Sequence, residues 1–304
     1  MTAGARGGNL QKKNRIQKNI SAWAIMLPTL VLFAFFIWEP ILESIRLSTY
    51  RGIGVDFSRL RFVGLDNYRL MFIDPNFKAA LSNTFIYILW SLIIGFFVPL
   101  IMAALISETA HLKSAIRVAI YFPNIMPGLA TAIIWTFLFR PGPTGVLNII
   151  LGWLGLAPFN WLSARGWTIP LIITTMTWKS AGSTALIYMA GIAGINPELY
   201  EAATIDGAKP MRRFWHITLP GLLSLGKTML ILQIISVFQV LYEPMMMTNG
   251  GPNNKSISMM MLVYQYAFRD FNYAMGTTIS VFICLILAVL TIIYFALTRK
   301  VSNE

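Results

Sequence analysis

The chain has only one cysteine and two histidines among its 304 residues, and charged residues make up only 12% of it. The single cysteine, Cys284, excludes a disulfide bond within the chain. Two histidines, His111 and His216, argue against a metal centre built from histidine side chains. Soluble domains carry about twice this share of charged residues. Because 56% of the residues are hydrophobic, more than a soluble fold of this size buries, the composition predicts a membrane protein.

Acidic residues are also scarce, with 12 Asp and Glu against 24 Lys and Arg. In a soluble protein the net charge of +12 would suggest nucleic acid as the partner. Beside membrane helices, however, basic residues mark the cytoplasmic ends, so we expect membrane lipid and no nucleic acid. Residues 1–20 hold five cations and no acid, which predicts a basic cytoplasmic tail. The apolar run that follows lacks the small-residue ending of a signal peptide and is interpreted as a retained first span.

Six apolar runs are long enough to cross a bilayer, which takes about 20 residues. They are Ser21–Ile41, Asn83–Ser107, Ile116–Phe139, Thr168–Gly194, Pro220–Tyr242 and Thr277–Thr298. Starting from the cytoplasm, six spans return residues 299–304 to the same side. Residues 42–82 then form an external loop, which we expect to fold as a small ordered cap. The sequence therefore predicts an all-α integral membrane protein with six transmembrane helices and both termini cytoplasmic.

Residues 221–228, GLLSLGKT, match the phosphate-loop pattern G-x-x-x-x-G-K-[ST] letter by letter. A working phosphate loop follows a strand and opens a helix within a βαβ unit. Here the match falls in the first turns of the fifth expected span. In that position Gly221 and Gly226 allow close helix packing, and Lys227 reaches the headgroups. We interpret the match as false and expect no catalytic site in this chain.

Between the fourth and fifth expected spans lies NPELYEAATIDGAKPMRRFWHITLP, residues 196–220. Asn196 is a good helix cap, and Pro197 suits the first helical position. Gly207 takes the left-handed conformation that ends a helix, and Pro210 can open a second short helix. Helices of this length are not stable alone in water. The pair is either a plain solvated connection or a surface shaped for the groove of a partner.

The spacing of this segment closely resembles the EAA loop of permease subunits of ABC importers. That pattern is E-A-A, three residues, G, nine residues and I-x-L-P. It is matched by Glu201, Ala202, Ala203, Gly207, Ile217, Leu219 and Pro220. The stretches FVGLDNYRLMF, TWKSAG and MTNGGPNNKS resemble the carbohydrate branch of the same family. The resemblance implies a type I ABC importer transmembrane domain (MetI-like) over residues 83–298, with residues 196–220 as its cytoplasmic coupling loop.

The resemblance also implies partners and a mechanism. Two ATPase subunits would dock at the coupling loop, with Glu201 as the charged anchor and Gly207 as the turn between two coupling helices. ATP would be bound by those subunits, so the chain itself needs no cofactor and no metal. A second homologous permease subunit would complete the pathway, and an extracytoplasmic solute-binding protein would deliver a carbohydrate-like solute. The expected location is the plasma membrane of a bacterium or archaeon.

Polar side chains inside the expected spans are candidates for the solute pathway, because polar groups are costly in a membrane. Lys179 in the fourth span is either a charge in the translocation cavity or a structural cation bonded to backbone carbonyls. Asn124 in the third span lies between Pro123 and Pro127, which break the helical hydrogen-bond ladder. It either satisfies a freed carbonyl or faces the solute.

The fifth span carries a stripe formed by Gln233, Ser236, Val237 and Val240, which share one helix face. By resemblance to maltose permeases, the positions of Gln233, Val237 and Val240 contact sugar. Two of them are valine here, a departure that argues against maltose itself. Gln233 is either a substrate contact or a partner in an interhelical hydrogen bond. The turn-rich loop that follows is either a contact for the binding protein or a plain surface loop.

Two other classes of protein compete with this interpretation. A secondary transporter or channel without an ATPase would show paired carboxylates inside the membrane or inverted repeats. The acids of this chain lie almost entirely outside the expected spans, and no repeat is visible. An integral-membrane enzyme would need a nucleophile with a base, or a metal cluster, and nothing in the sequence resembles either.

Overall fold

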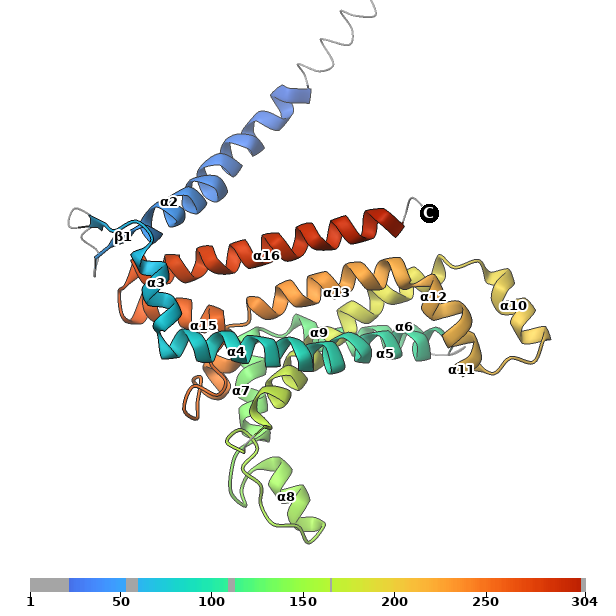
Figure 1. The fold of residues 1–304 in the computed structure, drawn as a ribbon. Coiled ribbons are helices and arrows are strands. Elements are labelled where there is room, and N and C mark those ends of the chain that lie inside the picture. The colour runs from blue at the N-terminus through green and yellow to red at the C-terminus, as the bar shows by residue number, and fades with distance from the viewer. Residues whose placement is uncertain (1–21, 53–59, 109–112, 165, 302–304) are drawn as a thin grey trace, which may run out of the picture.

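The computed structural model describes residues 22–52, 60–108, 113–164 and 166–301, which form a bundle of long helices with short helices at its ends (Figure 1). The basic tail predicted for residues 1–20 lies outside the described residues, as does the end of the predicted C-terminal tail. A two-stranded antiparallel sheet joins β1 (Tyr50–Arg51) to β2 (Arg61–Phe62). The other regular elements of the described residues are helical.

Several of the helices are interrupted by single turns of π-helix, labelled η. The first half of the chain contains η1 (Ala34–Trp38), α2 (Glu39–Ser48), α3 (Asp66–Ile73), α4 (Pro75–Trp90), η3 (Ser91–Phe96), α5 (Phe97–Glu108), α6 (Lys113–Ile125), α7 (Gly128–Leu138) and α8 (Val146–Trp153). The second half contains α9 (Thr168–Ala193), α10 (Pro197–Ile205), α11 (Pro210–Arg213), η4 (Phe214–Thr218), α12 (Leu219–Gly221), α13 (Leu223–Phe238), α14 (Tyr242–Met247), α15 (Met259–Tyr264), η5 (Gln265–Arg269) and α16 (Tyr273–Val301).

Three unbroken helices of the described chain are long and apolar enough to cross a membrane: Ala22–Ser48, Pro75–Glu108 and Tyr273–Thr298. They correspond to the first, second and sixth predicted spans. The second begins earlier than predicted because Pro75 takes the first helical position and the Asp74 carboxylate accepts the N–H of Asn76 at 2.9 Å. The connection predicted for residues 42–82 is therefore shorter and covers residues 49–74.

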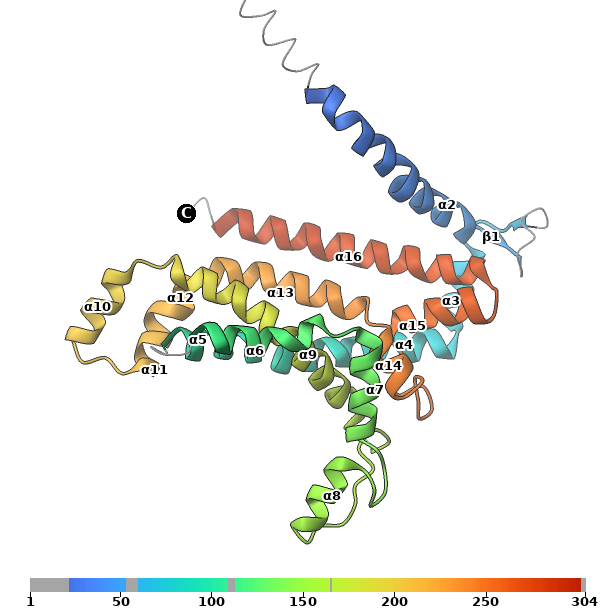
Figure 2. The same ribbon diagram turned by 180° about the vertical axis from the view of Figure 1, so that it is seen from behind.

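The third and fifth predicted spans are bent helix pairs instead of straight crossings. Ala115–Ile125 and Gly128–Leu138 meet at 96°, and Pro210–Gly221 and Leu223–Phe238 meet at 73°. The first bend falls at Pro127, which lacks an N–H for the helical ladder and has an extended ψ of 137°. Both views show α7 leaving the bundle nearly at right angles to α6 (Figures 1 and 2).

The fourth predicted span is α9, a helix of 26 residues. It is long enough to cross a membrane, but its threonines, serines and Lys179 make it too polar to be among the apolar spans. It lies against α5 and α6 and contributes buried residues along much of its length. A Cβ atom at Gly182 would lie 1.8 Å from the carbonyl oxygen of Ile120, so the backbones of α6 and α9 touch there.

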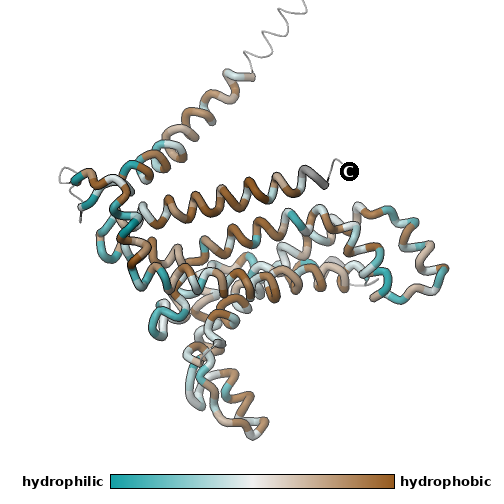
Figure 3. The backbone as a smooth tube through the Cα atoms, in the orientation of Figure 1, coloured by the Kyte–Doolittle hydropathy of each residue, from teal (hydrophilic) through white to brown (hydrophobic). Residues whose placement is uncertain are grey.

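The outer faces of the long helices are apolar (Figure 3). The first helix stands away from the bundle in both views and touches it through α2 and α16 (Figures 1 and 2). Its most apolar stretch is 0% buried. Water-soluble monomers rarely expose so large an apolar surface, whereas lipid or another membrane helix covers it at no cost.

The two ends of the bundle carry different elements. The helices α10, α11 and α12 lie at one end, and β1, α3 and α15 lie at the other (Figure 1). The C-terminal end of α16 points toward the end that carries α10. The predicted coupling loop and the predicted external loop thus lie at opposite ends of the molecule.

Candidate functional site

Residues 196–220 form a helical hairpin that projects from one end of the bundle (Figure 1). The Asn196 side-chain oxygen accepts the Glu198 N–H at 3.0 Å, and Pro197 follows it at the first helical position. The N-terminal cap predicted from the sequence is therefore confirmed. It places the Glu198 carboxylate at the positive end of the helix dipole.

The hairpin turns at Gly207, where α10 ends with a φ of +71°. The Ala208 N–H donates to the Ala203 carbonyl at 2.8 Å, and the Gly207 N–H donates to the Thr204 carbonyl at 3.0 Å. This pair of bonds is the Schellman arrangement, which requires a left-handed residue that glycine adopts without strain. The predicted glycine stop is confirmed.

The EAA residues lie on the outer surface of the hairpin. Glu201 and Ala202 are exposed and Ala203 is half-buried. Beside them Leu199 is 52% exposed and Ile205 is 86% exposed. Of the remaining pattern residues, Ile217 and Leu219 are half-buried and Pro220 is exposed. The described chain therefore leaves three carboxylates and several apolar side chains uncovered on a small projecting element, which suits a protein partner.

The hairpin is tied to the end of α5 by one arginine. Arg213 Nη2 lies 2.6 Å from a carboxylate oxygen of Glu108, and Nη1 donates to the Thr204 hydroxyl at 3.0 Å. A second bond joins the hydroxyls of Tyr200 and Thr218 at 2.9 Å. Since the arginine side chain is only 17% exposed, solvent screens this ion pair less than an exposed pair. The hairpin and α5 are thus connected by charge as well as by packing.

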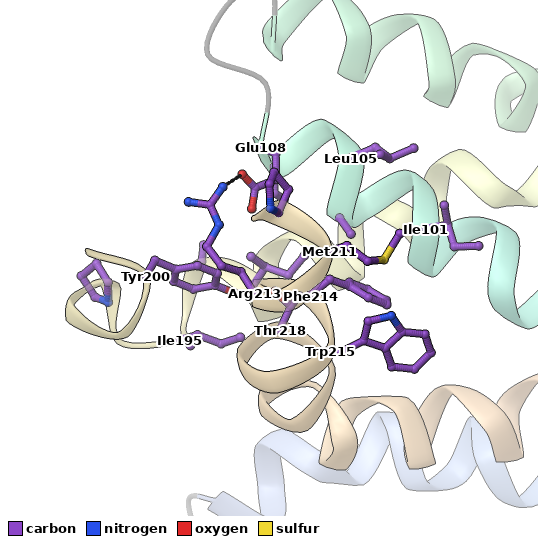
Figure 4. A pocket seen from close by; sticks show the side chains of 16 residues that line it. Ile101, Leu105, Glu108, Ile195, Tyr200, Met211, Arg213, Phe214, Trp215 and Thr218 are labelled. Carbon is purple, nitrogen blue, oxygen red and sulfur yellow. Dashed lines mark hydrogen bonds and ion pairs between the residues drawn. The ribbon is translucent and has the colours of Figure 1, made fainter. Parts of the chain in front are cut away.

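A pocket of about 650 Å³ lies between the hairpin and α5. Apolar side chains such as Leu105, Met211 and Phe214 line it, while Arg213 and Glu108 form a polar edge (Figure 4). The hairpin therefore borders this hollow and also packs against the buried core through Phe214 and Leu219.

The phosphate-loop match, residues 221–228, is helical apart from its bend. It runs from the end of α12 across the 73° break and into the first turns of α13. The described elements that precede it are the helices of the hairpin. A Cβ at Gly221 would lie 2.6 Å from Ile195 Cδ1, so this glycine permits close packing against the end of α9.

A cavity of about 260 Å³ lies between η3, α9 and α13. Its polar lining consists of Thr177, Ser180, Thr184, Tyr188, Gln233 and Ser236. Two of the predicted pathway residues, Gln233 and Ser236, are therefore brought together here. Val237 and Val240 are 2% and 4% exposed, and they are not part of this lining.

Gln233 is engaged with the second span in this conformation. Its amide nitrogen donates to the Ser91 hydroxyl at 2.6 Å. A Cβ at Gly95 would lie 2.6 Å from the same nitrogen, so the side chain rests on the backbone of η3. Of the two roles predicted for Gln233, the interhelical hydrogen bond is present, and it is made at the wall of the cavity.

Lys179 and Asn124 lie away from this cavity. The Lys179 ammonium is 3.5 Å from where a Cβ at Gly128 would stand, beneath the start of α7. Burial raises the pKa of the Glu243 carboxyl on α14, while a backbone hydrogen bond and the Lys179 charge oppose that rise. Asn124 accepts a long hydrogen bond of 3.4 Å from Ser183, which joins α6 to α9.

The turn-rich loop predicted to lie outside is fixed to α4. The Asn83 amide donates to the carbonyls of Asn254 and Ile257 at 2.7 and 3.0 Å. One helical turn further along, the Tyr87 hydroxyl donates to the Ser256 carbonyl at 2.8 Å. These buried bonds give the loop a fixed shape, which we call the outer loop (residues 248–258).

A family model described as "Binding-protein-dependent transport system inner membrane component" matches residues 95–303. The chain belongs to this family. The matched range of the permease runs from η3 through α16 and includes both the coupling hairpin and the cavity. The permease has the type I ABC transporter transmembrane fold (MetI-like).

Several curated relatives of the permease are named as permeases for sugars or oligosaccharides. It is 31% identical to the lactose transport system permease protein LacF of Rhizobium radiobacter over 93% of this chain and 95% of that protein. It is 30% identical to the arabinooligosaccharides transport system permease protein AraP of Bacillus subtilis over 94% of this chain and 91% of that protein. A chain of the bacterial alginate ABC transporter, solved in complex with its alginate pentasaccharide-bound periplasmic protein, superposes with a TM-score of 0.84. That chain is 24% identical, with 96% of this chain and 98% of that chain covered.

The sequence did not predict a role for four residues of the permease's candidate sites. Glu108 and Arg213 lie outside the expected spans, where charged residues are ordinary and give no signal of a mutual contact. Ser91 and Tyr188 gave no signal, because a serine or tyrosine inside an apolar run is unremarkable until its partner is known. A helical-wheel plot of α9 would have placed Tyr188 on the same face as Thr177 and Thr184.

Proposed function

We propose that the permease is a transmembrane subunit of a binding-protein-dependent ABC importer that moves a sugar, an oligosaccharide or a related polyol derivative into the cell. The observation that carries the proposal is the projecting hairpin, whose Glu201 and Ala202 are exposed while Arg213 ties it to α5. The names of the relatives, which refer to lactose and arabinooligosaccharides, support the carbohydrate class.

ATP hydrolysis on two separate ATPase subunits drives transport in this proposal. The subunits grip the hairpin at Glu201, with the Ala202–Ala203 strip against their cleft and Gly207 at the turn. Movement of the hairpin then reaches α5 through Arg213 and Glu108. A second homologous permease subunit supplies the other half of the pathway, against the apolar faces that this chain leaves uncovered.

The solute passes the cavity between η3, α9 and α13. Gln233 and Ser236 are its contacts, and Gln233 exchanges its Ser91 partner for the solute. Val237 and Val240 contact the solute only in a conformation in which this part of the chain turns toward the cavity. Asn124 and Lys179 lie where α9 meets its neighbouring helices, and the Lys179 charge there balances that of Glu243.

The hairpin end faces the cytoplasm of a bacterium or archaeon, and both termini lie on that side. The outer loop then faces outward, toward an extracytoplasmic solute-binding protein. Residues 221–228 bind no nucleotide in this proposal, because a helical segment within a span offers no concave nest of backbone N–H groups for phosphates.

A cross-linking experiment tests the two faces at once. Cys284 is the only cysteine, so Cys284→Ser gives a background for Ala202→Cys and, as the matched control, Asn253→Cys. Both positions are exposed. We expect Ala202→Cys to cross-link to a co-expressed ATPase subunit, and Asn253→Cys to react with a membrane-impermeant thiol reagent added outside. Exchange of the two patterns, or no ATPase adduct at residue 202, would contradict the proposal.

A further inference from the structure

The hydroxyl of Tyr188 is buried without a hydrogen-bond partner among the described residues. The side chain is 1% exposed, and its ring packs edge-on against Phe96 with 6.5 Å between the ring centroids. Buried polar atoms are nearly always paired, because an unpaired one loses its hydration without compensation. This hydroxyl therefore requires an explanation.

Tyr188 lines the same cavity as Gln233, and the two residues stand at different places along their helices. It lies five residues before the end of α9 that leads into the coupling hairpin. Gln233 lies five residues before the opposite end of α13. The cavity therefore extends from the level of Gln233 toward the hairpin, and the tyrosine lies at its inner part.

A polar stripe on α9 leads to this tyrosine. Thr177, Ser180, Thr184 and Tyr188 line the cavity at spacings of three and four residues, which place them on one helix face. Eleven residues of helix span about 16 Å, roughly half the thickness of the hydrocarbon core. The stripe gives a hydroxyl-bearing solute successive polar contacts along the helix, ending at the unpaired phenol.

We propose that the Tyr188 hydroxyl binds a hydroxyl group of the transported carbohydrate at an inner subsite, nearer to the coupling hairpin than Gln233. This inference rests on the proposed function. A phenol both donates and accepts a hydrogen bond, as a sugar hydroxyl does. The adjacent ring of Phe96, which also lines the cavity, offers an apolar face for the C–H side of a sugar ring. Tyr188 is thus a specificity-determining residue for the inward half of the pathway.

The test removes one oxygen atom with Tyr188→Phe. The complete transporter, with partner permease, ATPase subunits and binding protein, is reconstituted in proteoliposomes. Uptake is measured with radiolabelled lactose, arabinotriose and alginate trisaccharide, and the probe that wild type accumulates is carried forward. We expect the apparent KM for that probe to rise about three- to tenfold, the value of one hydrogen bond. The thermal midpoint of the detergent-purified variant should equal or exceed that of wild type, because an unpaired buried hydroxyl is lost.

The matched control is Tyr87→Phe, which removes a hydroxyl that already has a partner in Ser256. We expect it to lower the thermal midpoint. A Tyr188→Phe variant with unchanged KM would overturn the inference, since a buried water would then satisfy the hydroxyl. A lowered thermal midpoint of that variant would also overturn it, because the hydroxyl would then have a structural partner. Wild type that accumulates none of the probes would contradict the carbohydrate class of the proposed function. The thermal measurement would still decide whether the hydroxyl is unpaired.

Discussion

The turn of the coupling hairpin offers a substitution whose cost comes from the backbone alone. Gly207 has a φ of +71°, and no atom lies within 4 Å of the position that its Cβ would take. A larger residue therefore meets no neighbour, but its own backbone is strained. The left-handed conformation costs a non-glycine residue about 1–2 kcal/mol, which changes the population of the turn by a factor of roughly 5–30. A β-branched side chain lies at the upper end of this range.

We expect Gly207→Val to lower transport by a similar factor while leaving the amount of permease in the membrane unchanged. The turn is exposed and lies outside the spans, so insertion of the chain does not depend on it. The measurement is uptake of the transported sugar per permease, together with the amount of ATPase subunit that co-purifies with the permease from detergent.

Gly207→Asn is the matched control, because asparagine is of similar size but tolerates the left-handed conformation. We expect this variant to retain most of the transport and most of the bound ATPase. Equal losses in both variants would show that bulk, and not the backbone conformation, is what the partner rejects. Wild-type transport by Gly207→Val would refute the requirement for this turn.

Three further predictions concern contacts inside the permease. Glu108→Gln weakens the partly buried ion pair by about 1 kcal/mol; uptake should fall relative to ATP hydrolysis, and an unchanged ratio of sugar moved to ATP hydrolysed would count against coupling through α5. Gly182→Ala forces a methyl group against α6 and should cost about 1–3 kcal/mol, lowering the thermal midpoint in detergent, whereas Gly152→Ala, where nothing lies within 4 Å, should leave it unchanged. Lys179→Met removes a positive charge that favours the ionised form of the half-buried Glu243 carboxyl and should lower uptake. Glu243→Gln in the same chain should restore part of the uptake if the lysine is structural, and no restoration would favour a role in the pathway.

Sequence reasoning located the elements whose causes are local. The helix cap at Asn196 and the stop at Gly207 follow from the conformational preferences of those residues, and both are observed. The long apolar runs predicted the long helices, because hydrophobicity and length are also properties of a local segment. The bend in the third span was indicated by Pro127, but its size of 96° depends on how α7 packs against α14, which no local pattern specifies.

Contacts between distant parts of the chain were beyond a single sequence. Arg213 and Glu108 are 105 residues apart, and Gln233 and Ser91 are 142 residues apart. Each of these side chains has many possible partners until the helices are placed. The polarity of α9 was visible as Lys179 and its neighbouring threonines, yet its central place required the packing of the other helices around it.

The unbroken helix Pro75–Glu108 connects the two ends of the bundle. Its outer part holds the outer loop through Asn83, and its inner end holds the coupling hairpin through Glu108. A displacement at either end of this helix is therefore transmitted along it or absorbed by bending at η3, against which Gln233 packs. In the proposed function, this one helix would link docking of the solute-binding protein at one end to ATP hydrolysis at the other end.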